Sequence, residues 1–189
     1  MRETWLRGWV ALAIVAIGAS PAAAELVVEP PPPPPPPIAY RPQLQLDLGL
    51  AVAGVAFEHP IGPRFAIQLG VQVFSTYFAP WFDAGDKVQG GGGSLRATYF
   101  FARGGRGAYV APFLRVARVT GEHETGASGS GVGFSTGAWG GYAFRLSPKF
   151  DVRLGAGLQY MRYLVDTSAG RVGLSTPFIA LDIVIGYRL

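Results

Sequence analysis

Residues 180–189 read ALDIVIGYRL, and this C-terminal stretch decides the fold because two kinds of side chain alternate along it. One set is apolar, namely Leu181, Ile183, Ile185, Tyr187 and Leu189, and the other is mostly small or charged, namely Ala180, Asp182, Val184, Gly186 and Arg188. Successive side chains of a β-strand point to opposite faces. The stretch therefore predicts a strand with one apolar face and one face of different character.

The same alternation recurs along much of the chain from Gln43 onward. Apolar residues take every second position in residues 65–73, 94–101, 132–145 and 150–161. Residues 109–119 alternate as well, although Pro112 and Phe113 leave open which set faces which side. A period of two over so many segments predicts an all-β protein.

The second face distinguishes a soluble barrel from a membrane barrel. It is rich in Gly, Ala, Ser and Gln with occasional Arg and Asp, whereas the outside of a soluble barrel would carry many Lys and Glu residues. Charged residues make up 15% of the chain, against roughly 25% in an average soluble domain. We therefore expect the apolar face to meet lipid. Only a closed barrel lets strands cross a bilayer with every backbone group paired.

The lengths of the connections predict the strand count and the orientation. Short connections at residues 59–63, 103–107 and 146–149 alternate with longer ones at 79–87, 121–131 and 165–174. Short turns are typical of the periplasmic side and long loops of the outside. Seven strands are clear, and because bacterial single-chain barrels have even numbers, we divide residues 38–58 into two short strands around residues 49–51. The prediction is an eight-stranded, antiparallel, up-and-down transmembrane β-barrel over residues 38–189.

Aromatic residues are expected to form a girdle at each membrane interface. The inner girdle would contain Tyr99, Phe101, Tyr109, Tyr142, Phe144, Phe150 and Tyr187. The outer girdle would contain Tyr77, Phe78, Trp81, Phe82, Tyr160 and Tyr163.

The N-terminal residues predict export. Arg2 and Arg7 precede a short apolar run, and alanines 22–24 form the small-residue pattern that signal peptidases accept, so residues 1–24 are interpreted as a signal peptide cleaved near Ala24. Residues 25–37 are interpreted as a periplasmic spacer, because an unbroken run from Pro30 to Pro37 adopts an extended polyproline II conformation. That run is a linker or a docking site for a periplasmic partner. The expected location is the outer membrane.

Composition excludes several classes of function. The chain has no cysteine, which removes thiol catalysis, disulfides, cysteine-based zinc sites and a lipoprotein anchor. Its net charge of +4 is spread along the chain without a nucleic-acid footprint, so nucleic acid is discarded as a partner. No cofactor or metal is expected.

Charged residues on the inward face form the best candidate constellation: Asp47, Glu58, Arg96, Arg115, Asp151, Arg153, Asp182 and Arg188. An eight-stranded barrel is just wide enough for side chains to fill it. Buried charges must be paired, so these groups should pair across the lumen. The favoured interpretation is a structural network of ion pairs, and the alternative is a gated ion path.

Two other motifs contain residue types that can carry catalysis or bind a metal. Residues 133–137 match the G-x-S-x-G pattern around Ser135, but that nucleophile elbow needs a strand-to-helix turn, whereas here a strand continues. His123 between Glu122 and Glu124 offers metal-ligand chemistry, yet a solvated loop explains it better. No catalytic residue is therefore assigned.

With these features, residues 40–189 resemble the small eight-stranded outer-membrane barrels, the group that includes the OmpA membrane domain, OmpX, OmpW and opacity-type proteins. The resemblance lies in residues 54–58, the short turn, and the strand from Phe65 towards Pro80 and Trp81. It also lies in the C-terminal residues Ile183, Ile185, Gly186, Tyr187 and Leu189, which resemble the assembly signal of such barrels, although members typically end in Phe or Trp.

The resemblance implies a barrel inserted by the barrel assembly machinery and in contact with outer-membrane lipid and lipopolysaccharide. We expect a structural or surface-interaction role with short extracellular loops and no enzymatic activity. The alternative is a narrow channel or carrier for small or apolar molecules. A lipid-modifying enzyme is less favoured, because lipid A deacylases of this barrel class use a His-x-Ser pair, and His123 is followed by Glu124 and Thr125.

Overall fold

The computed structural model of the chain describes residues 40–76 and 87–189. The predicted signal peptide, the proline-rich spacer and four members of the predicted outer girdle (Tyr77, Phe78, Trp81 and Phe82) lie outside the described residues. Those interpretations stay predictions. No helix in the described ranges is long and apolar enough to cross a membrane.

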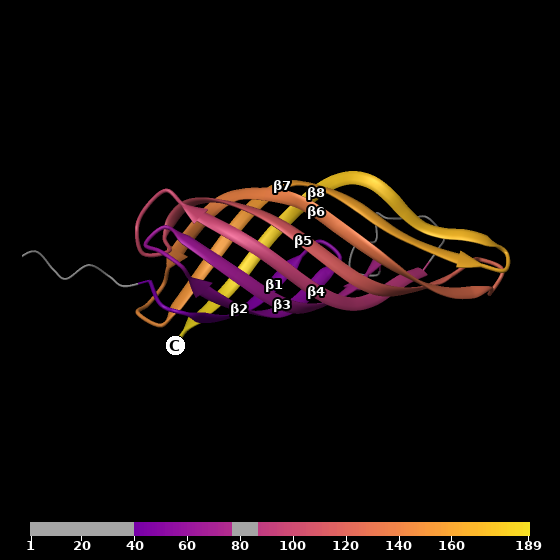
Figure 1. Cartoon of the computed structure of the whole chain (residues 1–189), viewed down its shortest axis with the longest axis horizontal. Coiled ribbons are helices and arrows are strands. Elements are labelled where there is room, and N and C mark those ends of the chain that lie inside the picture. Colours follow the sequence, from indigo (N-terminus) through magenta and orange to yellow (C-terminus); the bar gives the residue numbers. More distant parts are fainter. Residues whose placement is uncertain (1–39, 77–86) are drawn as a thin grey trace, which may run out of the picture. The chain divides into compact units, whose positions relative to one another are not determined.

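Eight antiparallel strands form a closed barrel in simple sequence order (Figure 1). They are β1 (Gln43–Gly49), β2 (Val52–Pro60), β3 (Phe65–Ser75), β4 (Lys87–Phe100), β5 (Gly107–Glu122), β6 (Ser128–Arg145), β7 (Phe150–Thr167) and β8 (Gly170–Arg188). Strand β1 closes the barrel by pairing with β8, from Gln43 opposite Arg188 to Leu48 opposite Ile183. The predicted fold class is confirmed.

The division of the first strand region is confirmed as well. Strands β1 and β2 are only 7 and 9 residues long and are joined by a tight turn at residues 50–51. Ala51 takes a left-handed conformation with a φ of 62° and is buried. A non-glycine residue in that conformation is strained, and its burial in the lumen holds it in place.

The outward face is apolar along the barrel wall. Leu69, Val71, Val132 and Leu158 are 62%, 64%, 74% and 71% exposed, and each lies on the face away from the lumen. Because a water-soluble monomer rarely exposes a continuous apolar surface of this extent, the wall is suited to lipid. Pro112 is also on this face, and the β4–β5 ladder is interrupted opposite it, since proline has no N–H to donate.

Two girdle assignments were wrong. Tyr109 and Tyr163 are 2% and 1% exposed and point into the lumen. Tyr109 has the same parity as Ala111 and Phe113, both of them buried, so it cannot share the outer face with Val110. The other described aromatic residues of both predicted girdles do face outward, namely Tyr99, Phe101, Tyr142, Phe144, Phe150, Tyr160 and Tyr187.

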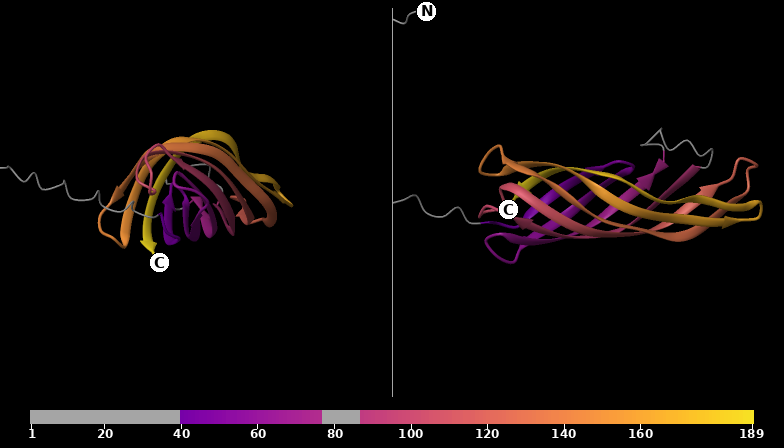
Figure 2. Two further views of the ribbon diagram at one scale, coloured as in Figure 1. Left: turned by 60° about the vertical axis from the view of Figure 1, so that its left-hand side comes forward. Right: turned by 90° about the horizontal axis from the view of Figure 1, so that it is seen from above.

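The long connections predicted at residues 121–131 and 165–174 were also wrong. Strands continue through most of both segments, leaving turns of residues 123–127 and 168–169. Strands β6, β7 and β8 have 18, 18 and 19 residues, well above the roughly 9–11 that cross a bilayer. Strands β5–β8 therefore extend past the rest of the barrel as two hairpins, at the end opposite the C-terminus (Figures 1 and 2). We call these two ends the hairpin end and the C-terminal end.

Candidate functional site

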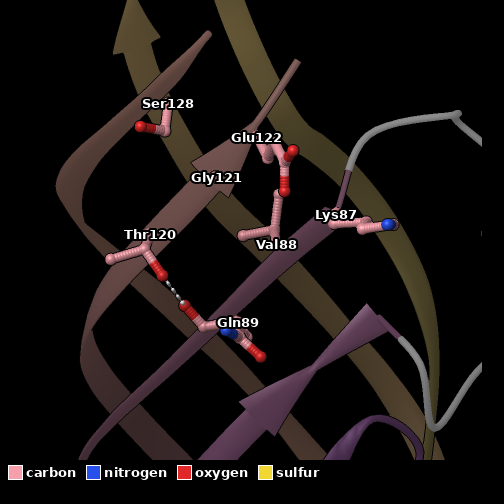
Figure 3. Close-up of a pocket in the computed structure, with 7 residues that line it drawn as sticks. All are labelled: Lys87, Val88, Gln89, Thr120, Gly121, Glu122 and Ser128. Atoms are coloured by element: carbon pink, nitrogen blue, oxygen red, sulfur yellow. Dashed lines mark hydrogen bonds between the residues drawn. The ribbon is translucent and has the colours of Figure 1, made fainter. Parts of the chain in front are cut away.

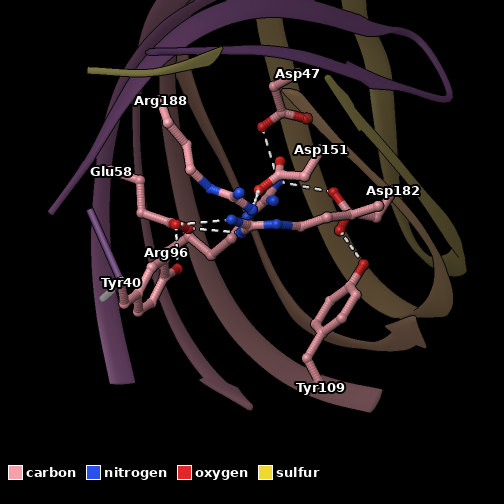
Figure 4. A network of polar contacts seen from close by, with 9 residues as sticks. Tyr40, Asp47, Glu58, Arg96, Tyr109, Asp151, Asp182 and Arg188 are labelled. Atoms are coloured by element: carbon pink, nitrogen blue, oxygen red, sulfur yellow. Dashed lines mark hydrogen bonds and ion pairs between the residues drawn. The ribbon is translucent and has the colours of Figure 1, made fainter. Parts of the chain in front are cut away.

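The structure places all eight predicted charged residues inside the barrel, none more than 6% exposed. They come from β1, β2, β4, β5, β7 and β8, and Figure 4 shows Asp47, Glu58, Arg96, Asp151, Asp182 and Arg188 gathered in the lumen. Four are arginines and four are carboxylates, so the set is electrically neutral. Because the opposite charges balance, these buried groups can neutralise one another.

The middle of the lumen is organised around Arg96. Its guanidinium Nη2 lies 2.8 Å from Asp47 Oδ2 and 2.9 Å from Asp182 Oδ1, so one arginine joins β1, β4 and β8. The Tyr109 hydroxyl donates to Asp182 Oδ2 at 2.6 Å, and Arg115 lies 3.8 Å from Asp47. Contacts across the lumen therefore connect strands that are not neighbours in the barrel wall.

A second set of ion pairs lies nearer the C-terminal end. Arg153 donates from both terminal nitrogens to Glu58, at 2.6 Å and 2.7 Å, in a forked arrangement. The Tyr40 hydroxyl donates to the same carboxylate. Burial raises the pKa of the Tyr40 phenol above its ordinary value. Arg188 Nη2 donates to Asp151 Oδ2 at 2.8 Å, which ties the last residue of β8 to β7.

Aromatic rings pack against the arginines of the middle layer. Trp139 stacks on Phe113 with ring centroids 3.8 Å apart. The Arg96 and Arg115 guanidinium carbons lie 4.3 Å and 5.0 Å from the Trp139 ring centroid. A cation over an aromatic face is attracted by the ring, so the aromatic residues hold the two guanidinium groups in place.

The hairpin end of the lumen is apolar. We call the residues that fill it the outer apolar cluster: Ala51, Val52, Phe74, Val88, Ala117, Val119, Met161, Tyr163, Val165 and Val172. Phe74 and Tyr163 stack with centroids 4.4 Å apart. They come from β3 and β7, which lie on opposite sides of the barrel, so this stack bridges the lumen.

Sequence reasoning missed Tyr40 and Tyr109 as members of the charge network. Tyr109 has the same parity as Arg115 on the same strand, and this signal could have placed it inside. Tyr40 precedes β1, where no alternation assigns a face, so only the folded structure could bring it to Glu58.

The other candidate motifs carry no assembled chemistry in the described part of the chain. Ser135 is buried in the lumen and accepts a hydrogen bond from the Tyr163 hydroxyl at 3.2 Å. His123 lies in the β5–β6 turn with Nδ1 3.0 Å from the Thr125 hydroxyl. Among described residues, no group of three or more His, Asp or Glu side chains could hold a metal ion.

A groove of about 320 Å³ lies between β4 and β5 at the hairpin end, where Lys87, Gln89, Thr120 and Glu122 are among the lining residues (Figure 3). The Thr120 hydroxyl donates to the Gln89 carbonyl across it at 3.3 Å. Lys87 and Glu122 are opposite each other in the ladder. The groove therefore has one positive and one negative side chain, and it favours neither anionic nor cationic ligands.

The predicted C-terminal assembly residues form the closing seam. Ile183, Ile185 and Tyr187 face outward, Gly186 pairs with Gln45 of β1, and the Leu189 N–H donates to the Pro42 carbonyl at 3.0 Å. A Cβ at Gly186 would lie 2.2 Å from Gln43 Oε1 and 2.3 Å from Asp151 Oδ1. Glycine at this position therefore leaves room for the lumen side chains beside the seam.

Comparisons with known proteins show the fold. No protein-family model matches the chain, and no curated protein does either. Among solved structures, the N-terminal β-barrel domain of Pseudomonas aeruginosa OprF is 16% identical, with a TM-score of 0.52 over 79% of this chain and 96% of that one.

Two further solved structures were found. Neisserial surface protein A is 13% identical, with a TM-score of 0.48 over 79% of this chain and 94% of that one. A major outer membrane protein from Thermus thermophilus is 16% identical, with a TM-score of 0.44 over 78% and 99%. With the closed barrel and its register, the OprF match shows that the chain has the fold of the small eight-stranded outer-membrane β-barrels.

Proposed function

We propose that this protein is an integral outer-membrane barrel with a structural or surface-interaction role, and that its lumen does not conduct and performs no catalysis. The single observation that carries the proposal is the filling of the lumen by two different layers. Ion pairs around Arg96 and Arg153 occupy one part, and the outer apolar cluster occupies the hairpin end.

The two layers oppose transport for different reasons. An apolar molecule would have to displace paired charges in the middle of the barrel, at the cost of leaving buried ions without partners. An ion would have to enter the outer apolar cluster, where Val119 and Val165 are completely buried and offer no polar group. Neither class of solute finds a continuous path that suits it.

The hairpin end supports the surface role. Two hairpins project beyond the length that lipid would cover, and their tips carry exposed polar groups such as the ion pair of Arg171 with Asp166 at 2.7 Å. Hydrogen bonds between the paired strands continue almost to the tips of both hairpins. The hairpins therefore present a preformed surface, and a binding partner would not have to order a flexible loop.

Two measurements test the proposal together. Outer-membrane fractions should contain the protein, and its gel mobility should shift on boiling, as expected of a closed barrel. A soluble periplasmic location with no shift would overturn the membrane assignment.

Planar bilayers should then show no conductance steps from the purified barrel, with a general porin in the same bilayer as the positive control. Reproducible steps from this protein would overturn the closed lumen and establish the alternative of a narrow channel. Lipid hydrolysis that is lost in His123→Ala would overturn the absence of catalysis.

A further inference from the structure

A second groove, of about 400 Å³, lies on the outward face of β6, β7 and β8. Its lining includes Val132 and Phe134 of β6, Arg162, Leu164 and Asp166 of β7, and Arg171 of β8. The groove therefore combines apolar side chains with cations on a surface that faces away from the lumen.

Its height on the barrel follows from strand geometry. An apolar band about 25 Å tall, crossed by strands tilted at about 40° with a rise of about 3.3 Å per residue, takes roughly ten residues of each strand. Counting about ten residues from the outward aromatic Phe144 along β6 reaches Phe134, and counting about ten from the outward aromatic Phe150 along β7 reaches Tyr160, two residues before Arg162. The groove thus lies where the band ends, at the level of lipid headgroups.

The protein does not neutralise all of the charges around this groove. Asp166 is paired with Arg171 at 2.7 Å. Arg162 is exposed and makes no ion pair or side-chain hydrogen bond within the described part of the chain, and the same holds for Arg118 on the outward face of β5. Two available cations therefore stand beside exposed apolar side chains.

The ladder sets the spacing of these two cations. Arg118 is opposite Val132 and Arg162 is opposite Phe134, so the arginines lie on either side of β6 with a two-residue offset. Two strand spacings and that offset put their Cα atoms roughly 12 Å apart. Such a separation suits two distinct anionic groups on one headgroup better than a single phosphate.

We propose that this surface binds the phosphate-bearing glycolipid of the outer leaflet, with one phosphate at Arg162, a second at Arg118, and an acyl chain along Val132 and Phe134. The inference rests on the proposed membrane location. Arginine suits the role because its planar guanidinium donates two parallel hydrogen bonds to a phosphate. The apolar residues beside the arginines favour a lipid as the source of the phosphate, since free phosphate has nothing to place on them.

The test uses the full barrel, reconstituted in nanodiscs of neutral phospholipid. Binding of fluorescent bisphosphorylated lipid A, monophosphorylated lipid A and phosphatidylglycerol is measured for wild type, Arg162→Gln, Arg118→Gln and Arg162→Lys. Arg103→Gln is the matched control, because Arg103 is an exposed arginine in the β4–β5 turn at the opposite end. Each sample is first checked for the heat-dependent gel shift.

Wild type should prefer bisphosphorylated lipid A to both other lipids. Each glutamine variant should weaken that binding roughly five- to tenfold, as expected for a charge-assisted contact at a partly exposed site. Arg162→Lys should recover part of the affinity, and Arg103→Gln should match wild type.

The inference would be overturned if wild type and both glutamine variants bound bisphosphorylated lipid A equally, or if wild type bound phosphatidylglycerol as tightly as bisphosphorylated lipid A. If the gel shift is normal in that case, the proposed function still stands. A wild-type protein that shows no gel shift and does not insert would instead refute the proposed function itself.

Discussion

Replacing Glu58 with Gln gives the most direct test of the closed lumen. Glu58 and Arg153 are both fully buried, and the carboxylate receives two hydrogen bonds from Arg153, at 2.6 Å and 2.7 Å. Glutamine keeps nearly the same shape but removes the negative charge. Arg153 would then remain as a buried cation without its counter-ion, and breaking one partner of a buried pair costs about 3–5 kcal/mol.

The assay is equilibrium unfolding in urea of the barrel inserted in lipid vesicles, followed by the boiling-sensitive band on gels and by tryptophan fluorescence. Trp139 is a suitable reporter because it is buried in the lumen against Arg96. Glu58→Gln should lower the free energy of unfolding by about 3–5 kcal/mol. The double variant Glu58→Gln with Arg153→Met should regain most of the loss, since it removes the unpaired charge.

Asp166→Asn is the matched control, because it breaks an equally short ion pair, at 2.7 Å, whose side chains are 62% and 79% exposed. Solvent screens that pair, so its loss should leave unfolding unchanged. If Glu58→Gln is as mild as Asp166→Asn, or if the double variant is worse than the single one, the lumen is hydrated enough to screen its charges. The barrel interior would then not be tightly closed.

Three further predictions use the same unfolding assay or gel. Gly133→Ala should lower the free energy of unfolding by about 1–3 kcal/mol, because the added Cβ would lie 2.2 Å from Tyr163 Cδ1. Gly62→Ala should be neutral, because no atom lies within 4 Å of its Cβ, and equal effects of the two variants would contradict the packing around Gly133. Burial raises the pKa of the Tyr40 phenol, so above about pH 10 the unfolded chain releases this proton while the folded protein keeps it, and the wild type loses stability as the pH rises. Tyr40→Phe should make this loss smaller, and an unchanged pH dependence of the free energy of unfolding would show that Tyr40 is not buried. Leu189→Phe should increase the folded fraction on gels, as the resemblance of the C-terminus to the assembly signal implies, and no increase would argue against that signal.

Much of the fold could be predicted from alternation alone. A period of two needs no knowledge of distant contacts, since each residue's face depends only on its position along its own strand. That is why Asp151, Arg153 and Asp182 could be assigned to the inside, and why the even number of strands required a turn near residues 49–51. Tyr109 was placed outside because Pro112 and Phe113 obscured the parity of β5.

The two hairpins show a second limit of prediction from the sequence. Alternation continues through residues 121–131 and 165–174, but glycine and serine are frequent there, and small residues are equally typical of loops. Whether such a segment extends a strand depends on packing against its neighbours. Here the outer apolar cluster covers the inner face of both hairpins, with Val119, Val165 and Val172 buried. Only the folded barrel brings the side chains of this cluster together against the hairpins.

The sequence by itself determined that this chain forms a closed barrel with an apolar outside and a charged inside, because strand parity and composition are local properties. The tertiary structure alone decided which charges pair. Arg153 and Glu58 are 95 positions apart in the chain, and Arg96 and Asp47 are 49 apart. Their contacts depend on the register of every ladder between them and on closure of β1 against β8, so no reading of one strand could have assigned them.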